Sequence, residues 1–318
     1  MTTFKEIRGT AIQSVSSDPT NPEVGQIWYN NTIGVLKGYR SIGGAWASGG
    51  NLNTAISFLG GCGTQTAGLG FGGYATSVAT EEYNGSTWSP GGNLNTGRRL
   101  LAGAGTQTAG LAFGGGPPNS NSTEEYDGST WGPGGNLGTA RRGLAGAGTQ
   151  TAGLGFGGFA TANSNATEEY DGSAWTAGGN LGTARLDLAG AGTQTVGLAF
   201  GGFIPGPNAY SASTEEYDGS AWTAGGNLAT ARYGMAGAGI QTAALAAGGN
   251  TGSVTAATEQ YNGTSWTSAS SLATARNSGA GAGTQTLALA FGGITTVAVV
   301  NTEEFTDPSF AVQKITTS

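Results

Sequence analysis

Paired carboxylates recur along the chain, and they are the residue type with the clearest capacity for chemistry. The pairs are Glu81-Glu82, Glu124-Glu125, Glu168-Glu169, Glu215-Glu216 and Glu303-Glu304. Glycoside hydrolysis needs two carboxyl groups in contrasting environments, one protonated and one ionised. Identical pairs on successive segments provide no such contrast. We therefore expect a structural role, in which one Glu of each pair is solvated on a strand and its neighbour caps a loop or pairs with an Arg. A cation held by a ring of Glu is an alternative that the ligand spacing does not support.

Other groups that could catalyse a reaction are scarce. The sequence has no His, and Cys62 is its single cysteine, which excludes an intrachain disulfide and a Cys/His zinc site. Cys62 stands where similar segments of the chain have Ala, so we interpret it as a small buried residue; a reactive thiol is the alternative. The Gly-rich segments lack the Lys-Ser/Thr of a phosphate-binding loop. We expect no enzymatic activity, no cofactor and no metal ion.

Composition and charge narrow the classes of partner. The net charge is −7 and only 10% of the residues are charged. Because nonspecific nucleic-acid binding depends on Lys and Arg at phosphates, we expect no nucleic-acid partner. The sequence has no stretch of 18 apolar residues, and its start, from Met1 to Arg8, lacks the apolar core of a signal peptide. We therefore expect neither membrane insertion nor export by an ordinary signal peptide.

A repeat of 42 to 47 residues organises most of the chain. Each repeat contains a Gly-Gly pair, a Thr-Glu-Glu-Tyr segment, an Asp-Gly or Asn-Gly pair and a Trp, with small variations. The Trp positions are Trp46, Trp88, Trp131, Trp175, Trp222 and Trp266. A Gly-x-Gln-Thr block recurs at the same spacing. Repeats of this length with strand-like segments are typical of a β-propeller with one blade per repeat. The 62 Gly hold fixed positions beside aromatic residues, which favours a packed fold over disorder.

The repeat between Trp222 and Trp266 illustrates the expected blade. Residues 224–232 are Gly-rich and predict a connection between blades. Residues 233–239 predict an innermost strand, since Gly and Ala let neighbouring backbones approach. Residues 243–249 and 258–261 predict the second and third strands, and Asn262-Gly263 predicts a two-residue type I′ turn before the fourth strand.

The ring of blades must also be closed. Asp307-Pro308 interrupts the last hairpin. We therefore expect a strand near residues 45–47 to complete the blade built by residues 276–306, which would leave no bare sheet edge there.

The order Arg, apolar strand, Gly-Gly, Tyr, Asp-Gly, Trp resembles the kelch repeat over residues 46–310. The resemblance implies an all-β propeller with four antiparallel strands per blade and with Tyr and Trp packed between blades. Six Gly-Gly pairs and six Gly-x-Gln-Thr blocks predict six blades. The resemblance identifies the family's Arg before the first strand as Arg99, Arg142, Arg185, Arg232 and Arg276. The first repeat departs from the pattern with Thr54-Ala55-Ile56, and the last departs with Phe305 in place of Tyr. Kelch enzymes that hold copper do so with histidines, which this chain lacks.

The loops that follow the Gly-Gly pairs are the least repeated segments of the sequence. They span 74–79, 117–122, 159–166, 203–213, 250–257 and 294–301. All of them leave the same strand end, so we expect them on one face, where loops can vary without unfolding the frame. We select Tyr74, Phe159, Phe203, Asn208 and Tyr210 as candidate binding residues, since aromatic and amide side chains suit stacking on sugars and bonding to hydroxyls. Unselected drift in loop length is the alternative.

The N-terminal segment does not fit the repeat. Alternating residues on either side of Asn30-Asn31-Thr32-Ile33-Gly34 predict a β-hairpin. The pattern Gly-x-Ile-Trp-Tyr-Asn, then Leu-Lys-x-Tyr and Trp, resembles a segment of tailed-phage fibre and virion proteins. Together with the kelch-like repeats it resembles proteins of marine phages. A hairpin that only buttresses the propeller is the alternative. We expect three parts: an attachment segment with the hairpin (1–45), the propeller (46–310) and a C-terminal tail (311–318).

These resemblances imply a non-enzymatic phage virion protein, a tail-fibre or appendage component made in the host bacterial cytoplasm. It would present the propeller for binding to the host surface, including a glycan there. Its partners would be other virion proteins, through residues 1–45, and a host-surface glycan or protein. The alternatives are a structural protein that decorates or caps the particle, and a kelch protein–protein interaction module.

Overall fold

A computed structural model describes residues 12–20, 26–40, 44–204, 206, 210–307 and 311–315. The chain divides into two compact units, a larger one of Ala45–Thr306 and a smaller one of Met1–Gly44 with Asp307–Ser318. Strands dominate both, and the larger unit has a short 3-10 turn, η1 (Tyr74–Thr76). No helix in the described part of the chain is long and apolar enough to cross a membrane.

The smaller unit is a four-stranded sheet in the order β1-β2-β3-β28. Its strands are β1 (Gln13–Val15), β2 (Ile27–Asn30), β3 (Val35–Arg40) and β28 (Ala311–Lys314). Antiparallel pairing of β2 with β3 confirms the predicted hairpin. The C-terminal segment, expected as a tail, contributes β28, which pairs with β3. The Asp18 carboxylate accepts hydrogen bonds from Trp28, Asn30 and Lys37, which lower its pKa to about 2.

The larger unit consists of six four-stranded antiparallel sheets. We number them sheet 1 to sheet 6 and give the four strands of each sheet in order, from the first to the fourth. Sheet 1 is β5 (Gly60–Thr64), β6 (Ala67–Phe71), β7 (Thr80–Tyr83) and β8 (Trp88–Pro90); sheet 2 is β9 (Ala102–Gly105), β10 (Gly110–Phe113), β11 (Thr123–Tyr126) and β12 (Trp131–Pro133); sheet 3 is β13 (Ala145–Gly148), β14 (Gly153–Phe156), β15 (Thr167–Tyr170) and β16 (Trp175–Ala177); sheet 4 is β17 (Ala189–Gly192), β18 (Gly197–Phe200), β19 (Thr214–Tyr217) and β20 (Trp222–Ala224); sheet 5 is β21 (Ala236–Ile240), β22 (Ala243–Ala247), β23 (Thr258–Tyr261) and β24 (Trp266–Ala269); sheet 6 is β25 (Ala280–Gly283), β26 (Leu287–Phe291), β27 (Thr302–Thr306) and β4 (Ala45–Ser48).

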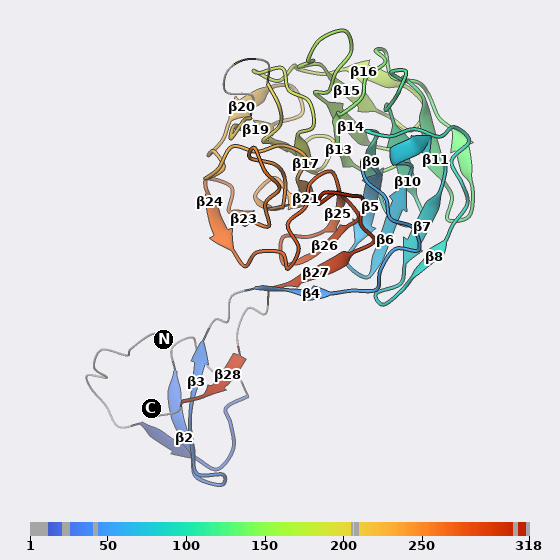
Figure 1. Cartoon of the computed structure of the whole chain (residues 1–318). Helices are drawn as coiled ribbons and strands as arrows, with labels where there is room; N and C mark the ends of the chain where they lie inside the picture. The colour runs from blue at the N-terminus through green and yellow to red at the C-terminus, as the bar shows by residue number, and fades with distance from the viewer. Residues whose placement is uncertain are drawn as a thin grey trace. The chain divides into compact units, whose positions relative to one another are not determined.

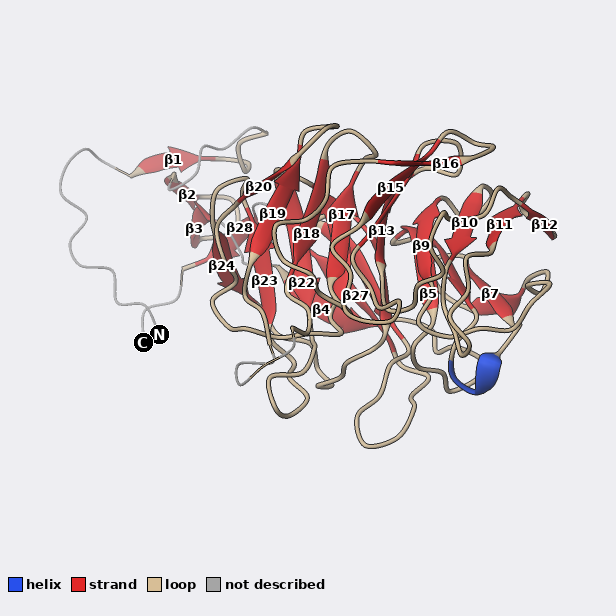
Figure 2. Ribbon diagram, turned by 90° about the horizontal axis from the view of Figure 1, so that it is seen from above, coloured by secondary structure: helices blue, strands red, loops and turns tan. Residues whose placement is uncertain are grey.

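The six sheets form a closed series, which is consistent with a β-propeller. Each first strand lies beside the first strand of the next sheet, and β25 lies beside β5 (Figure 1). Sheet 6 takes its fourth strand from the start of the unit, because β4 pairs with β27 in the register Trp46↔Phe305. This confirms the predicted strand near residues 45–47. Figure 2 shows the sheets from a second direction, with loops leaving both ends of the strands.

The first strands surround a channel of about 310 Å³ and consist mainly of Gly and Ala. A Cβ on Gly146 would lie 2.5 Å from the carbonyl oxygen of Gly103 in the neighbouring first strand. A real Cβ cannot approach an oxygen so closely, so Gly at this position lets the two backbones meet. The prediction that these strands are innermost is confirmed.

Trp and Gln at the repeated positions join each sheet to the preceding one. The Trp175 indole Nε1 donates to Thr123 Oγ1 at 2.9 Å, and the Trp175 ring packs against Phe113, with 4.7 Å between centroids. The Gln150 side chain donates to the backbone oxygens of Gly110 (3.1 Å) and Tyr126 (2.7 Å). The Trp–Thr bond recurs at Trp46, Trp88, Trp131, Trp222 and Trp266, and the Gln contacts recur at Gln65, Gln107, Gln194, Gln241 and Gln285. These contacts confirm the predicted packing of Trp between adjacent sheets.

The hairpin between the third and fourth strands differs from the prediction. The Asp127 N–H donates to the Thr130 oxygen (3.1 Å), so Gly128 and Ser129 are the two turn residues. Of these two, only Gly128 has a positive φ, 92°, whereas a type I′ turn needs a positive φ at both turn residues. The Asp127 carboxylate accepts hydrogen bonds from the N–H groups of Ser129 and Thr130, which lower its pKa to about 2. The turn therefore lies one residue later than predicted, and the Asp side chain bonds the N–H groups inside it.

Candidate functional site

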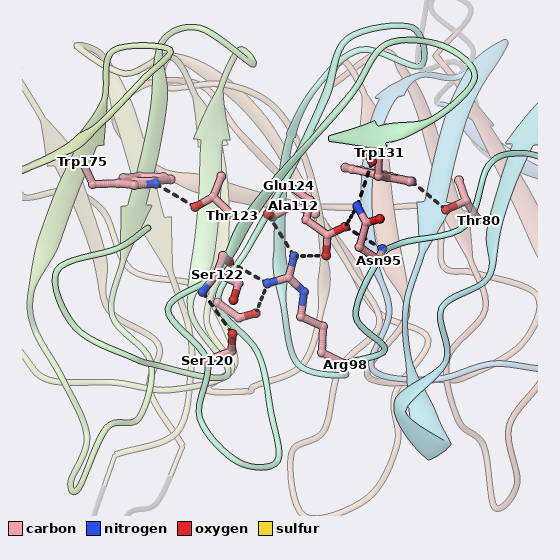
Figure 3. Close-up of polar contacts among 11 residues, drawn as sticks. Thr80, Asn95, Arg98, Ala112, Ser120, Ser122, Thr123, Glu124, Trp131 and Trp175 are labelled. Carbon is pink, nitrogen blue, oxygen red and sulfur yellow. Dashed lines mark hydrogen bonds and ion pairs between the residues drawn. The ribbon is translucent and has the colours of Figure 1, made fainter. Parts of the chain in front are cut away.

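A buried Arg bonds to the variable loop in five of the sheets, and in four of them it bonds to both ends of the loop. In sheet 2, Arg98 Nη1 donates to the backbone oxygens of Gly114 (3.2 Å) and Ser122 (2.6 Å), at the beginning and end of the loop (Figure 3). Its Nη2 lies 3.0 Å from Glu124 Oε1. Glu124 Oε2 in turn accepts from the N–H of Asn95, in the connection between sheets. Loops of different sequence therefore leave the same rigid base.

The same ion pair recurs in sheets 3 to 6. The pairs are Arg141–Glu168, Arg185–Glu215, Arg232–Glu259 and Arg276–Glu303. Burial lowers the pKa of each guanidinium, and the neighbouring Glu acts in the opposite direction. The predicted position of the Arg before the first strand is therefore wrong by one residue in sheets 2 and 3. Arg98 and Arg141, rather than Arg99 and Arg142, are the buried members of their Arg-Arg doublets, because only they reach the Glu of the third strand.

The second Glu of each pair is also engaged, contrary to the expectation that it is solvated. Tyr170 Oη donates to Glu125 Oε1 of the preceding sheet at 2.5 Å. Burial and this hydrogen bond raise the pKa of Tyr170 to about 12. The same bond joins Tyr83 to Glu304, Tyr126 to Glu82, Tyr217 to Glu169 and Tyr261 to Glu216. The recurring carboxylates thus serve packing within and between sheets.

Sheet 1 lacks the Arg, as the sequence indicates. Ile56 stands near the corresponding place, beside a small cavity of about 30 Å³ that Glu81 also lines. Glu81 accepts hydrogen bonds from the N–H groups of Asn53 (2.8 Å) and Thr54 (3.3 Å). The first Glu therefore keeps its role of capping the connection even where no guanidinium is present.

The variable loops define what we call the loop face, and a ring of backbone hydrogen bonds lies inside it. Six residues at equivalent positions precede the six first strands, one before each. The N–H of each donates to the backbone carbonyl of the equivalent residue before the preceding sheet. The pairs are Phe58–Ser278, Leu100–Phe58, Gly143–Leu100, Asp187–Gly143, Gly234–Asp187 and Ser278–Gly234, with N···O distances of 2.7–2.8 Å. All six residues have φ between 51° and 63°. This left-handed conformation is rare outside Gly, so a closed ring of bonds maintains it at Phe58, Leu100, Asp187 and Ser278.

The ring encloses a depression of about 100 Å³, which we call the axial depression. Phe58, Leu100, Leu188 and Met235 line it together with backbone groups, and Asp187 is its one carboxylate. Burial raises the pKa of Asp187 to about 6, while the charge of Arg142 acts in the opposite direction. Asp187 as a whole residue remains partly exposed.

The structure brings some of the predicted site residues together. Phe203 and Tyr210 are neighbours, with 6.3 Å between ring centroids, and both contact Tyr233, which stacks on Tyr210 at 5.4 Å. Tyr74 is 55% exposed and lies in the loop of sheet 1. Phe159 belongs to the loop of sheet 3. Asn208 lies outside the described residues.

Two arginines that the sequence reasoning misassigned lie against these aromatic residues. The Arg99 guanidinium carbon is 5.3 Å from the Tyr74 ring centroid and 6.0 Å from that of Phe58. The Arg142 carbon is 4.6 Å from the Phe159 centroid. Tyr233, Arg99 and Arg142 occupy the position directly after the buried Arg, which differs from repeat to repeat. That variation was a signal for finding them.

Cys62 lines the channel and is buried. Burial raises the pKa of its thiol to about 12, which suppresses the reactive thiolate. In the described part of the chain, no cluster of three or more Cys, Asp or Glu side chains could hold a metal ion.

Comparison with known proteins supports the fold. No family model matches the sequence, and no curated protein matches it. Among solved structures, one described as "Structure of YjhT" matches with a TM-score of 0.70 and 13% identical residues. The match covers 84% of this chain and 100% of that one. At this identity the similarity concerns the fold alone, and it is consistent with a β-propeller.

Proposed function

We propose that the larger unit is a six-bladed propeller of the kelch type and that the chain is a non-enzymatic phage virion protein. In this proposal a tail fibre or other appendage carries the chain, the segment 1–45 attaches it to other virion proteins, and the loop face contacts the host surface, including a glycan there. The closed series of six sheets supports the blade count. The kelch-like order of residues and the phage-like N-terminal pattern support the rest.

One observation carries the binding role. The recurring polar side chains contact partners inside the fold: Trp on Thr, Gln on backbone oxygens, Tyr on one Glu, and Arg on the other. Aromatic residues that do not recur gather instead on the loop face, where Phe203, Tyr210 and Tyr233 form a cluster. Aromatic clusters at a surface are typical of recognition sites. The division between recurring frame and varied face is the arrangement expected of a binding module.

The same division supports a non-enzymatic role. The carboxylates that could catalyse hydrolysis are the recurring ones, and each first Glu pairs with an Arg or caps the connection to the preceding sheet. Five second Glu accept a Tyr hydroxyl. Turnover of a polysaccharide by the purified protein would contradict this part of the proposal.

Cryo-electron microscopy of the intact particle tests the proposal. We expect the smaller unit to contact other virion proteins and the loop face to be free. A loop face buried against other virion proteins would refute host binding and favour a decoration or cap protein. Absence of the chain from purified particles would refute the virion assignment and favour an interaction module in the cell.

A further inference from the structure

Sheet 1 lacks the buried Arg of the other five sheets but keeps the Glu that pairs with it. Residues 51–56 read Asn-Leu-Asn-Thr-Ala-Ile, and the equivalent residues 93–98 of sheet 2 read Asn-Leu-Asn-Thr-Gly-Arg. Ile56 therefore takes the place of Arg98. No Arg or Lys of the described residues lies within 4 Å of the Glu81 carboxylate, whereas the other five first Glu each pair with an Arg.

In sheet 2, four acceptors surround the Arg98 guanidinium (Figure 3). One is the Glu124 carboxylate, whose Oε1 lies 3.0 Å from Nη2. The others are backbone oxygens at 2.6–3.4 Å, those of Ala112, Gly114 and Ser122. Four acceptors that carry a single negative charge match one planar cation that donates several hydrogen bonds.

Sheet 1 has the same acceptors at equivalent positions. Gly72 has a φ of 68° where Gly114 has 67°, so the backbone turns in the same way. The Gly72 N–H bonds to the Ala79 oxygen at 3.0 Å, and the equivalent bond of sheet 2 is 3.1 Å long. Gly70 lies opposite Glu81 in the ladder of β6 and β7, which is the register of the corresponding pair in sheet 2. The backbone that binds a guanidinium is therefore retained in sheet 1.

These acceptors line one cavity of about 30 Å³, together with Ile56. Gly72 is buried, and none of the described residues donates a hydrogen bond to its carbonyl oxygen; the equivalent oxygen accepts from Arg in sheets 2, 3, 4 and 6. A buried carbonyl without a donor is uncommon. Thr54 and Ala79, which also line the cavity, are exposed, so the cavity adjoins solvent. Because one water needs about 10–15 Å³, the cavity has room for about two groups of this size, such as the two terminal nitrogens of a guanidinium.

The Glu81 carboxylate has an oxygen that can still bind a cation. Its Oε1 accepts a hydrogen bond from the Thr54 N–H at 3.3 Å. In sheet 6 the same bond, from the Thr274 N–H to Glu303 Oε1, is also 3.3 Å long and coexists with the ion pair to Arg276. The bond from Thr54 therefore leaves room for a second donor on the same oxygen.

We propose that this cavity of sheet 1 binds a guanidinium group supplied by another molecule, either a small guanidinium compound or the side chain of an arginine. Glu81 would balance its charge, and the backbone oxygens of Gly70, Gly72 and Ala79 would accept its N–H groups, as their equivalents do in sheet 2. The site belongs to the frame of sheet 1, so it would bind its cation whether or not the chain is part of a virion.

Calorimetric titration of the full chain at constant ionic strength tests the proposal. The probes are guanidinium chloride, potassium chloride and N-acetylarginine amide, at concentrations far below those that unfold proteins. We expect guanidinium to bind at least about tenfold more tightly than K⁺, since its N–H groups form charge-assisted hydrogen bonds. Binding of guanidinium without the arginine amide would support a site for a small compound, and binding of both would support a site for an arginine side chain. Equal binding of K⁺, or no detectable binding of guanidinium, would overturn the proposal.

Three variants locate the binding. Ile56→Arg supplies the guanidinium from the chain itself and should abolish binding of the added ion. Glu81→Gln keeps the shape of the side chain but removes its charge, so binding should weaken about tenfold, and it tests the same cavity if Ile56→Arg does not fold. Asp218→Asn removes one charge from the hairpin turn of sheet 4, where two other repeats have Asn, and should leave binding unchanged. Unchanged binding by a folded Ile56→Arg or by Glu81→Gln, or an equal loss in Asp218→Asn, would refute the site.

Discussion

Arg141→Gln should destabilise the folded chain by about 3–5 kcal/mol, the cost of removing one partner of a buried ion pair. The Arg141 side chain is 0% exposed. It donates to the carbonyls of Gly157 (2.8 Å) and Ala166 (2.7 Å) and to Glu168 (2.8 Å). A hydrogen bond that involves a charged group contributes about 1.5–3 kcal/mol. A Gln amide can replace one of the three bonds, and Glu168 still accepts from Gly138 N–H at 2.6 Å, so the net loss falls within that range.

Arg142→Gln is the matched control, because it changes the adjacent residue in the same way. Arg142 is partly exposed, and the variant loses one bond to Asn119 and the contact with the Phe159 ring. These interactions contribute about 1–2 kcal/mol together.

Equilibrium unfolding in guanidinium chloride, followed by Trp fluorescence, measures both variants. The midpoint should fall much further for Arg141→Gln, with an unchanged dependence on denaturant concentration. The reasoning would be refuted if Arg141→Gln cost less than about 1 kcal/mol, or if the two variants were equally destabilised.

Three further predictions concern other parts of the larger unit. Gly146→Ala should lower the free energy of unfolding by roughly 1–3 kcal/mol, because the added Cβ would collide with the Gly103 carbonyl. Gly132→Ala is the control, since an added Cβ there meets nothing within 4 Å, and it should change the free energy of unfolding by less than about 0.5 kcal/mol. Similar losses for both variants would contradict the close approach of the first strands. Cys62 should resist iodoacetamide at pH 8 until the protein is unfolded, because burial raises its pKa to about 12; labelling of the folded protein at the rate of a free thiol would contradict its burial. The pKa of Asp187 rises from 3.8 to about 6 on folding, so its favourable contribution is present below pH 4 and is lost as the pH rises through 6. Asp187→Asn should therefore stabilise the protein at pH 8 by roughly 1–2 kcal/mol, less than the full shift implies since the residue is partly exposed. A variant with the wild-type pH dependence of stability would disprove the shift.

Replacements in two repeats show how much of an inter-sheet contact can be predicted from sequence. Phe305 stands where the other repeats have Tyr, and Gln260 stands where they have the second Glu. In the other repeats, the Tyr hydroxyl at the position of Phe305 bonds to the Glu carboxylate at the position of Gln260, as Tyr261 of sheet 5 bonds to Glu216 of sheet 4. The corresponding contact here would lie between sheets 5 and 6. Both departures thus fall in the same contact. The partnership became recognisable only when the structure paired each Tyr with the preceding sheet.

The sequence predicted which loops form the candidate site, but it did not predict all of the residues that meet there. The repeat placed Tyr74, Phe159, Phe203 and Tyr210 on loops that leave the same strand end. It could not place Tyr233 beside Phe203 and Tyr210, because that contact depends on how the loop of sheet 4 folds against the start of sheet 5. Asn208, which was chosen on the same grounds, lies outside the described residues.

The sequence by itself determined the strands, their order and the closure of sheet 6 by residues 45–48. These features follow from local alternation of residue types, from the turn residues and from a repeat that recurs along the sequence. It also indicated which Trp and Tyr lie between sheets. Only the tertiary structure decided which Arg of each doublet is buried, since Arg98 and Arg99 have the same local preferences and differ in whether they reach Glu124. The ring of left-handed residues around Asp187 was likewise decided by tertiary structure. Five of its bonds join residues 42 to 47 positions apart, and the sixth joins Phe58 to Ser278 near the two ends of the unit, so no local pattern specifies them until the six sheets meet around one axis.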